Sequence, residues 1–126
     1  MSEPVRLIAA EDRTSPPGAQ TPGMSREQAI ATDDYWMGVV TAEPETNSGW
    51  HHHSEHDSYI YVIDGTGTLD FGPGGIEVIQ ASVDDIIHVP KGVVHRERTS
   101  QGLKALVVRV GSGLPVVNVD GPDPVA

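Results

Sequence analysis

The chain contains no cysteine, and this absence removes three classes of site at once. Without a thiol there is no disulfide framework, no thiolate metal site and no cysteine nucleophile. Disulfides stabilise secreted domains far more often than cytosolic ones, so their absence favours a cytoplasmic location. Any chemistry must therefore come from histidine, carboxylate, hydroxyl and amine side chains.

Basic residues are scarce as well. Only 8 Lys and Arg stand against 18 Asp and Glu, which gives a formal net charge of −10. Nucleic acids and anionic membrane surfaces bind basic patches, so we expect neither as a partner. Long apolar runs are also missing: none approaches the length that spans a bilayer, and residues 1–10 lack the apolar stretch of a signal peptide.

Helical periodicity is weak after Thr32, and short segments of alternating apolar residues take its place. Each segment is bounded by Gly, Pro or Asp, a pattern that indicates an all-β sandwich or barrel. The 126 residues are enough for one domain with one core. The expected strands are residues 35–42, 58–64, 68–71, 76–80, 85–89, 93–99, 103–110 and 115–119.

The two ends of the chain differ in composition from its middle. Residues 4–23 contain Pro16-Pro17-Gly18 and Pro22-Gly23 among small and polar residues, so we expect residues 1–23 to form a flexible N-terminal arm. Residues 24–32 are expected to form a short helical turn capped by Ser25. The barrel domain would then occupy residues 24–119, with 120–126 as a Pro-rich, acidic tail.

Histidine is concentrated in one short stretch, where four of the six histidines fall between residues 51 and 56. Imidazole is a common ligand for transition metals, and charged rings packed together would repel one another. In an extended segment alternate side chains share a face, so His51 and His53 point one way and His52 the other. Glu55-His56-Asp57 then reads as a polar corner before the next strand.

A second stretch, residues 84–99, carries two more histidines. Pro90-Lys91-Gly92 predicts a tight turn, because proline fixes φ and glycine permits a positive φ. His88 lies on the strand that enters this turn, and His95 lies on the strand that leaves it. A metal site formed by His51 and His53 needs a ligand from a distant strand, and His95 is the candidate. Arg96 and Arg98 alternate with His95 and should point away from the site.

Together the two stretches resemble the paired motifs of the cupin superfamily. His51-His52-His53, followed by the apolar run that ends at Gly65, is similar to the first cupin motif, and residues 90–95 are similar to the core of the second. The resemblance implies a small single-domain cupin, with a jelly-roll or double-stranded β-helix barrel. It also implies that the histidines bind a divalent metal. Many cupins are dimers, so the resemblance suggests a homodimer, with the N-terminal arm as a candidate for exchange between subunits.

The first motif departs from the family pattern because its glutamate is missing. Counting back from Gly65 puts Ser58 in that position, whereas a one-residue β-bulge would bring Asp57 inward. We favour Asp57 as the fourth ligand beside His51, His53 and His95; the alternatives are Ser58, His56 and water. Imidazoles with at most one carboxylate suit Fe, Mn, Ni, Cu, Co or Zn better than calcium.

The resemblance implies several chemistries and does not choose among them. The first expectation is a dioxygenase-type oxidoreductase that acts on a small oxygenated molecule, with His88 or Tyr61 handling protons. An isomerase or lyase that uses His88 as its base is the alternative enzyme. A module that binds a metal or small molecule without catalysis is the alternative from another class.

Overall fold

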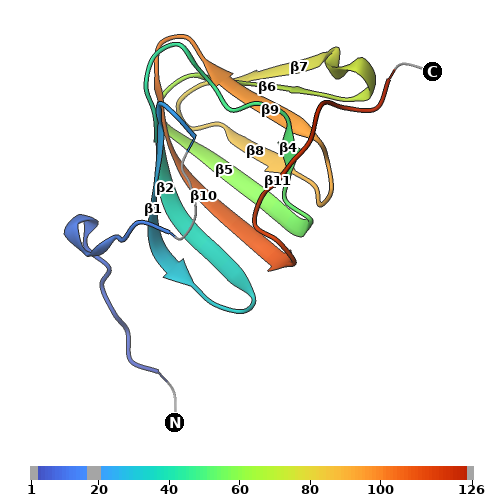
Figure 1. Cartoon of the computed structure of the whole chain (residues 1–126). Coiled ribbons are helices and arrows are strands. Elements are labelled where there is room, and N and C mark those ends of the chain that lie inside the picture. Colours follow the sequence, from blue (N-terminus) through green and yellow to red (C-terminus); the bar gives the residue numbers. More distant parts are fainter. Residues whose placement is uncertain (1–2, 17–20, 125–126) are drawn as a thin grey trace.

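The computed structural model describes residues 3–16 and 21–124 (Figure 1). Within these ranges the chain forms eleven strands and two short 3₁₀ helices, η1 (Ala10–Asp12) and η2 (Pro73–Gly75). The paired strands of both sheets run antiparallel, which confirms the expected all-β class. No helix in the described ranges is both long and apolar enough to cross a membrane.

The first sheet has five strands in the order β1-β2-β10-β5-β8. The long strands β2, β10 and β5 form its centre, because β10 pairs with β2 on one side and with β5 on the other. The bounds are β1 (Met24–Ala31), β2 (Tyr35–Ala42), β10 (Leu103–Ser112), β5 (Glu55–Gly65) and β8 (Ile86–Val89).

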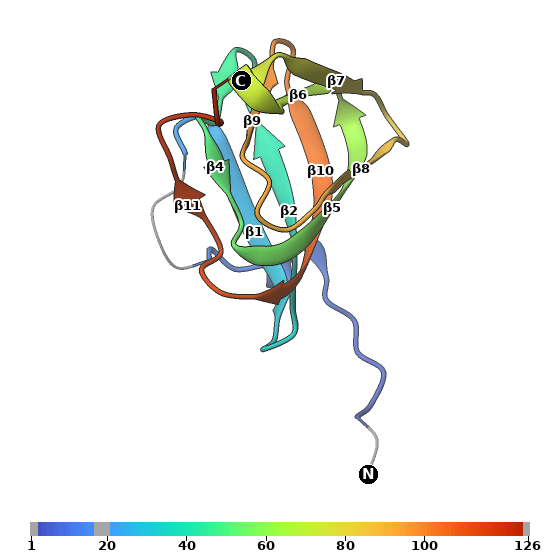
Figure 2. The ribbon, with the colours of Figure 1, turned by 90° about the vertical axis from the view of Figure 1, so that its right-hand side faces the viewer.

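The second sheet follows the order β11-β4-β9-β6-β7, and β3 also pairs with β9. Figures 1 and 2 show the two sheets curving around a shared interior. This arrangement is the barrel of the double-stranded β-helix class. The bounds are β3 (Thr46–Asn47), β4 (His51–His52), β6 (Gly67–Phe71), β7 (Glu77–Ala81), β9 (His95–Thr99) and β11 (Val117–Asn118).

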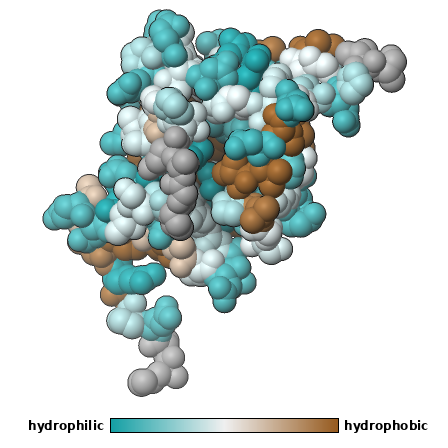
Figure 3. Space-filling view, in the orientation of Figure 1, coloured by the Kyte–Doolittle hydropathy of each residue, from teal (hydrophilic) through white to brown (hydrophobic). Residues whose placement is uncertain are grey.

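Alternation along the strands fills the barrel interior. In β5 Ile60 and Val62 are buried, while Tyr59, Tyr61 and Ile63 are exposed, as the sequence predicted. The interior side chains from both sheets form one hydrophobic cluster: Met24, Val40, Ala42, Ile60, Val62, Leu69, Ala81, Ile87, Val89, Ala105 and Val107. Hydrophilic side chains cover most of the face shown in Figure 3, where the largest gathering of hydrophobic residues lies right of centre and smaller ones lie at the lower left and upper right.

The predicted helical turn at residues 24–32 is wrong. This segment is β1, which pairs with β2 from Met24 opposite Ala42 to Ala31 opposite Trp36. Ser25 favours the start of a helix only through a local capping preference, and the backbone hydrogen bonds that the segment forms with β2 stabilise the strand more. As a strand, the segment turns Met24, which is buried, toward the barrel interior.

Two further boundaries differ from expectation near the histidines. The turn after β4 falls at Ser54, whose φ is 54°, and Glu55-His56-Asp57 is the beginning of β5 instead of a corner. The loop expected at residues 44–48 contains the two-residue strand β3. The register of β5 is therefore set by its pairing with β10 from the first residue.

The expected arm is only partly described. Residues 1–2, 17–20 and 125–126 lie outside the described residues, so part of the Pro16-Pro17-Gly18 turn does too. Thr14 and Gln28 exchange two backbone hydrogen bonds of 2.9 and 2.6 Å, which ties this point of the segment to β1. The expected domain limits and the flexibility of residues 1–23 stay predictions.

Candidate metal centre

Three histidines from two regions of the sequence meet inside the barrel. His51 on β4 lies directly opposite His95 on β9, and His53 follows two residues after His51. The ring centroids are 4.4 Å apart for His51 and His95, 4.9 Å for His51 and His53, and 5.1 Å for His53 and His95. All three side chains are buried. The structure thus brings together the three histidines that the sequence selected as ligands.

Each of the three rings is oriented by a backbone carbonyl. His51 Nδ1 donates to the Gly49 oxygen at 3.0 Å, His53 Nδ1 to the Pro115 oxygen at 2.7 Å, and His95 Nδ1 to the Val93 oxygen at 2.9 Å. A carbonyl can only accept, so each Nδ1 carries a proton and the neutral ring has its lone pair on Nε2. This is how metal-binding histidines are commonly held.

The carboxylate at this cluster belongs to Glu97, which the sequence analysis missed. Its Oε1 lies 3.3 Å from His95 Nε2 and 3.9 Å from His51 Nε2. Ligand atoms of the four residues His51, His53, His95 and Glu97 all lie within 4.8 Å of one another. A signal for Glu97 was present, because two residues after His95 on a strand share its face. Arg96 and Arg98 point away, as expected, and both bind Asp70.

Asp57, the expected fourth ligand, is not part of the cluster, and this expectation is corrected. The pairing of β5 with β10 is continuous from Glu55 to Val62, so the bulge needed to turn Asp57 inward is absent there. Ser58 is buried on the inner side instead. Asp57 Oδ1 lies 3.0 Å from His88 Nε2, in a pair on the other side of the sheet.

His88 and Tyr61, the side chains expected to move protons, also lie on that outer face. The His88 ring stacks on the Tyr59 ring with centroids 5.0 Å apart, and its side chain is 49% exposed. The Tyr61 hydroxyl donates to Asp84, which raises the pKa of Tyr61. Neither residue lines the interior cavity. Tyr61 shares the outward face of β5 with Tyr59, and His88 lies opposite Tyr59 on β8, so both side chains point away from the interior.

The remaining sequence candidates are placed as follows. His52 lies on β4 between the two inward rings, and its Nδ1 accepts a hydrogen bond from the Ser54 amide. His56 Nδ1 donates to the His53 carbonyl at 2.8 Å, so this ring also serves the local turn. Ser58 Oγ is buried, has no hydrogen-bond partner among the described residues and faces the interior.

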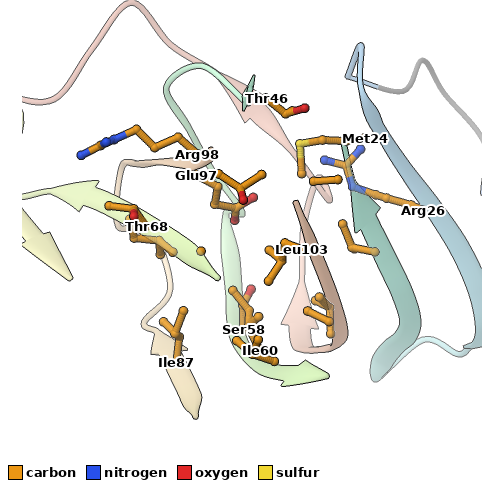
Figure 4. A pocket seen from close by; sticks show the side chains of 18 of the residues that line it. Met24, Arg26, Thr46, Ser58, Ile60, Thr68, Ile87, Glu97, Arg98 and Leu103 are labelled. Atoms are coloured by element: carbon orange, nitrogen blue, oxygen red, sulfur yellow. The ribbon is translucent and has the colours of Figure 1, made fainter. Parts of the chain in front are cut away.

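A cavity of about 50 Å³ lies beside the cluster, between the two sheets. Figure 4 shows Glu97 and Ser58 pointing into it from β9 and β5, with Arg26 reaching in from β1 and Arg98 directed away. Most of its wall is apolar and comes from the core residues of both sheets. A molecule in this cavity would therefore meet polar groups at the cluster, at Ser58 and at the arginines, and otherwise hydrocarbon.

Burial and charge give the four side chains different protonation states. Burial lowers the pKa of His51, and burial together with the Arg109 charge lowers the pKa of His53 to about 3. Burial also lowers the pKa of His95, but the hydrogen bond and the charge of Glu97 outweigh this effect, so the pKa of His95 is raised. Burial opposes ionisation of Glu97, yet the facing histidines hold its pKa well below the usual range.

These directions predict how many protons a metal displaces. At a pH between the lowered pKa values of His51 and His53 and the raised pKa of His95, the metal-free protein holds its extra proton on His95 and the other two rings are neutral. Binding one divalent ion should release about one proton, and the release should vanish as pH rises through the raised pKa of His95. Calorimetry in buffers of different ionisation enthalpy measures this number. Release of two or three protons would contradict the assigned states.

The four residues fit a divalent transition metal. Ligands at about 2.1 Å from one ion lie at most about 4.2 Å apart, so ligand atoms 4.8 Å apart must approach by at least about 0.6 Å, a shift within the reach of side-chain rotation. His51 Nε2 is buried and has no hydrogen-bond partner among the described residues, a costly state that coordination relieves. Three imidazoles and one carboxylate can serve ions of the Mn-to-Zn series.

Comparison with known proteins agrees with this geometry. The family model described as the cupin domain matches residues 38–110, which include all four residues of the cluster. An uncharacterized protein, YdbB of Bacillus subtilis, is 38% identical over 63 residues. That match covers 50% of this chain and 50% of the relative, so it spans about half of each protein.

Solved structures share the fold at low sequence identity. The polyketide cyclase RemF from Streptomyces resistomycificus has a TM-score of 0.75 at 21% identity, covering 91% of this chain and 85% of RemF. An uncharacterized protein with a double-stranded β-helix domain from Klebsiella pneumoniae has a TM-score of 0.69 at 20% identity, covering 90% and 96%. With the fold, the converging histidines and the matched family model in agreement, this chain belongs to the cupin superfamily.

Proposed function

We propose that this protein binds one divalent transition metal through His51, His53, His95 and Glu97, and uses it to act on a small oxygenated organic molecule. The observation that carries the proposal is the shared orientation of the three imidazoles. Each donates Nδ1–H to a backbone carbonyl, which leaves the three Nε2 atoms near the Glu97 carboxylate. A bound ion of this kind supplies Lewis acidity and, if it is redox-active, can react with dioxygen.

Among the possible reactions, the cavity favours oxidation of the dioxygenase type. Among the described residues, the titratable side chains that line the cavity are three of the proposed ligands, His51, His53 and Glu97, and three arginines. His88, the base that an isomerase or lyase would use, lies on the outer face beside Asp57. An oxidation at the metal needs a separate protein base less than an isomerisation or elimination does, so it fits a cavity whose titratable side chains are proposed ligands and arginines.

Oxygen uptake by iron-loaded protein tests this activity. Protein loaded anaerobically with Fe(II) would be mixed with air-saturated buffer and a panel of catechols, diketones and organic acids. We expect uptake with at least one member and none from the His95→Ala variant. Saturable binding of panel members without uptake would instead support the same centre acting as a binding module.

We also propose that the protein is a homodimer that pairs through the outer face of β5 and β8. Tyr59, Tyr61, Ile63 and Ile86 expose 42%, 37%, 40% and 68% of their surface on these strands. Such an apolar sheet face is commonly covered by another subunit. Light scattering after size exclusion should give twice the chain mass, and Ile86→Asp should shift the protein toward monomer. A monomeric parent protein would contradict the proposal.

A further inference from the structure

Three unpartnered polar atoms surround the interior cavity. In the described part of the chain, His51 Nε2, Ser58 Oγ and Arg109 Nε are buried without a hydrogen-bond partner, and all three residues line this cavity. Burying a polar group without a partner is costly. The proposed metal accounts for His51 Nε2 and leaves Ser58 and Arg109 unexplained.

Arg109 is the more unusual of the two. It lies on β10 opposite Ser58 of β5 and opposite Trp36 of β2, and only 7% of its surface is exposed. None of the hydrogen bonds or ion pairs found among residues 3–16 and 21–124 involves its guanidinium, although its carbon Cζ lies 4.9 Å from the centre of the Trp36 ring. Stacking on an aromatic face leaves the in-plane N–H groups of an arginine available.

Positive charge accumulates on this side of the cavity. Arg26 enters the same cavity from β1 (Figure 4), and its charge, after burial, lowers the pKa of Arg109, which falls to about 10. Both arginines also line the larger groove outside, of about 670 Å³, so they stand between that groove and the inner cavity. An anion that enters past them would gain charge-assisted hydrogen bonds and reduce their mutual repulsion.

We propose that Arg109, with the Ser58 hydroxyl beside it, binds the carboxylate of a short-chain organic acid. The planar carboxylate matches the planar guanidinium, and the hydrocarbon part of the acid would lie against the apolar wall formed by residues such as Ile60 and Val107. The second oxygen function of such an acid would face the histidine cluster, and this part of the inference rests on the proposed function. The substrate class is thus an acid with a second oxygen group.

Binding of propanoate, compared with the neutral propanamide, tests the inference. The two probes have nearly the same shape, so their difference reports on charge. NMR titrations would use full-length protein, once loaded with Zn²⁺ and once dialysed against EDTA. We expect propanoate to bind about tenfold or more tightly than propanamide, the factor that 1.4 kcal/mol represents. Arg109→Gln should abolish this preference, and Arg109→Lys should retain part of it.

Arg6→Gln is the matched control, because it changes net charge equally at an exposed position. It should leave the preference for propanoate unchanged, and circular dichroism should show that all three variants are folded. An Arg109-dependent preference in either metal state supports the inference. Equal binding of the two probes to the parent protein, or an undiminished preference in folded Arg109→Gln, would overturn it. Zn²⁺ affinity is measured separately, so failure of the metal proposal is distinguishable from failure of this one.

Discussion

Replacement of His95 by alanine should lower the affinity for Zn²⁺ or Fe²⁺ by at least about a hundredfold. Loss of a residue that only supports a ligand commonly costs about 10- to 100-fold, so loss of a ligand should cost at least as much. His95 is 1% exposed and lies on β9 directly opposite His51 of β4, so it is the histidine that the second sequence stretch contributes to the cluster. Competition titration with a chromogenic chelator measures the affinity.

His52→Ala is the control for this change. His52 lies next to both inward ligands, but its Nδ1 accepts a hydrogen bond from the Ser54 amide and its ring is outside the cluster. We expect its metal affinity to stay within about threefold of the parent, since no ligand is lost. His95→Gln, which fills more of the space that alanine leaves empty, separates metal loss from misfolding. Equal losses in His52→Ala and His95→Ala would contradict the assignment.

The second large effect is expected at Glu97. Glu97→Gln removes the carboxylate charge but keeps the shape, and it should lower metal affinity by about 10- to 100-fold. The same change should lower the pKa of His95 in the metal-free protein, because the Glu97 hydrogen bond and charge are what raise it. Metal titration and NMR of the imidazole resonances measure the two effects.

Asp57→Asn provides the matched comparison, since it is the same chemical change at the carboxylate that the sequence favoured. Asp57 pairs with His88 on the outer face, so we expect its loss to leave metal binding unchanged. A larger affinity loss in Asp57→Asn than in Glu97→Gln would mean that β5 shifts its register in the native protein.

Side-chain alternation made most of the barrel predictable from the sequence. The period of two identified the central strands 35–42, 58–64 and 103–110, and it placed His51 and His53 on one face with His52 on the other. Although β4 and β9 are far apart in the chain, His95 was predictable as a ligand, because the turn at residues 90–92 indicates that a strand carrying His95 follows it.

The misses have physical causes. Residues 24–32 form a strand only because β2 offers them an edge, and no local pattern reports that pairing. Asp57 was selected by assuming a bulge, although register is fixed by the partner strand β10. Glu97 lies outside the position where the family motif places its glutamate, so the motif does not predict it as a ligand. In this chain Ser58 occupies that position, and the carboxylate comes from β9 instead.

Anomalous diffraction from crystals of metal-loaded protein, recorded at the absorption edge of the metal, tests the central claim most directly. The account predicts one peak at about 2.0–2.2 Å from Nε2 of His51, His53 and His95 and from a Glu97 carboxylate oxygen. A peak at the Asp57–His88 pair on the outer face, or no peak inside the barrel, would contradict it.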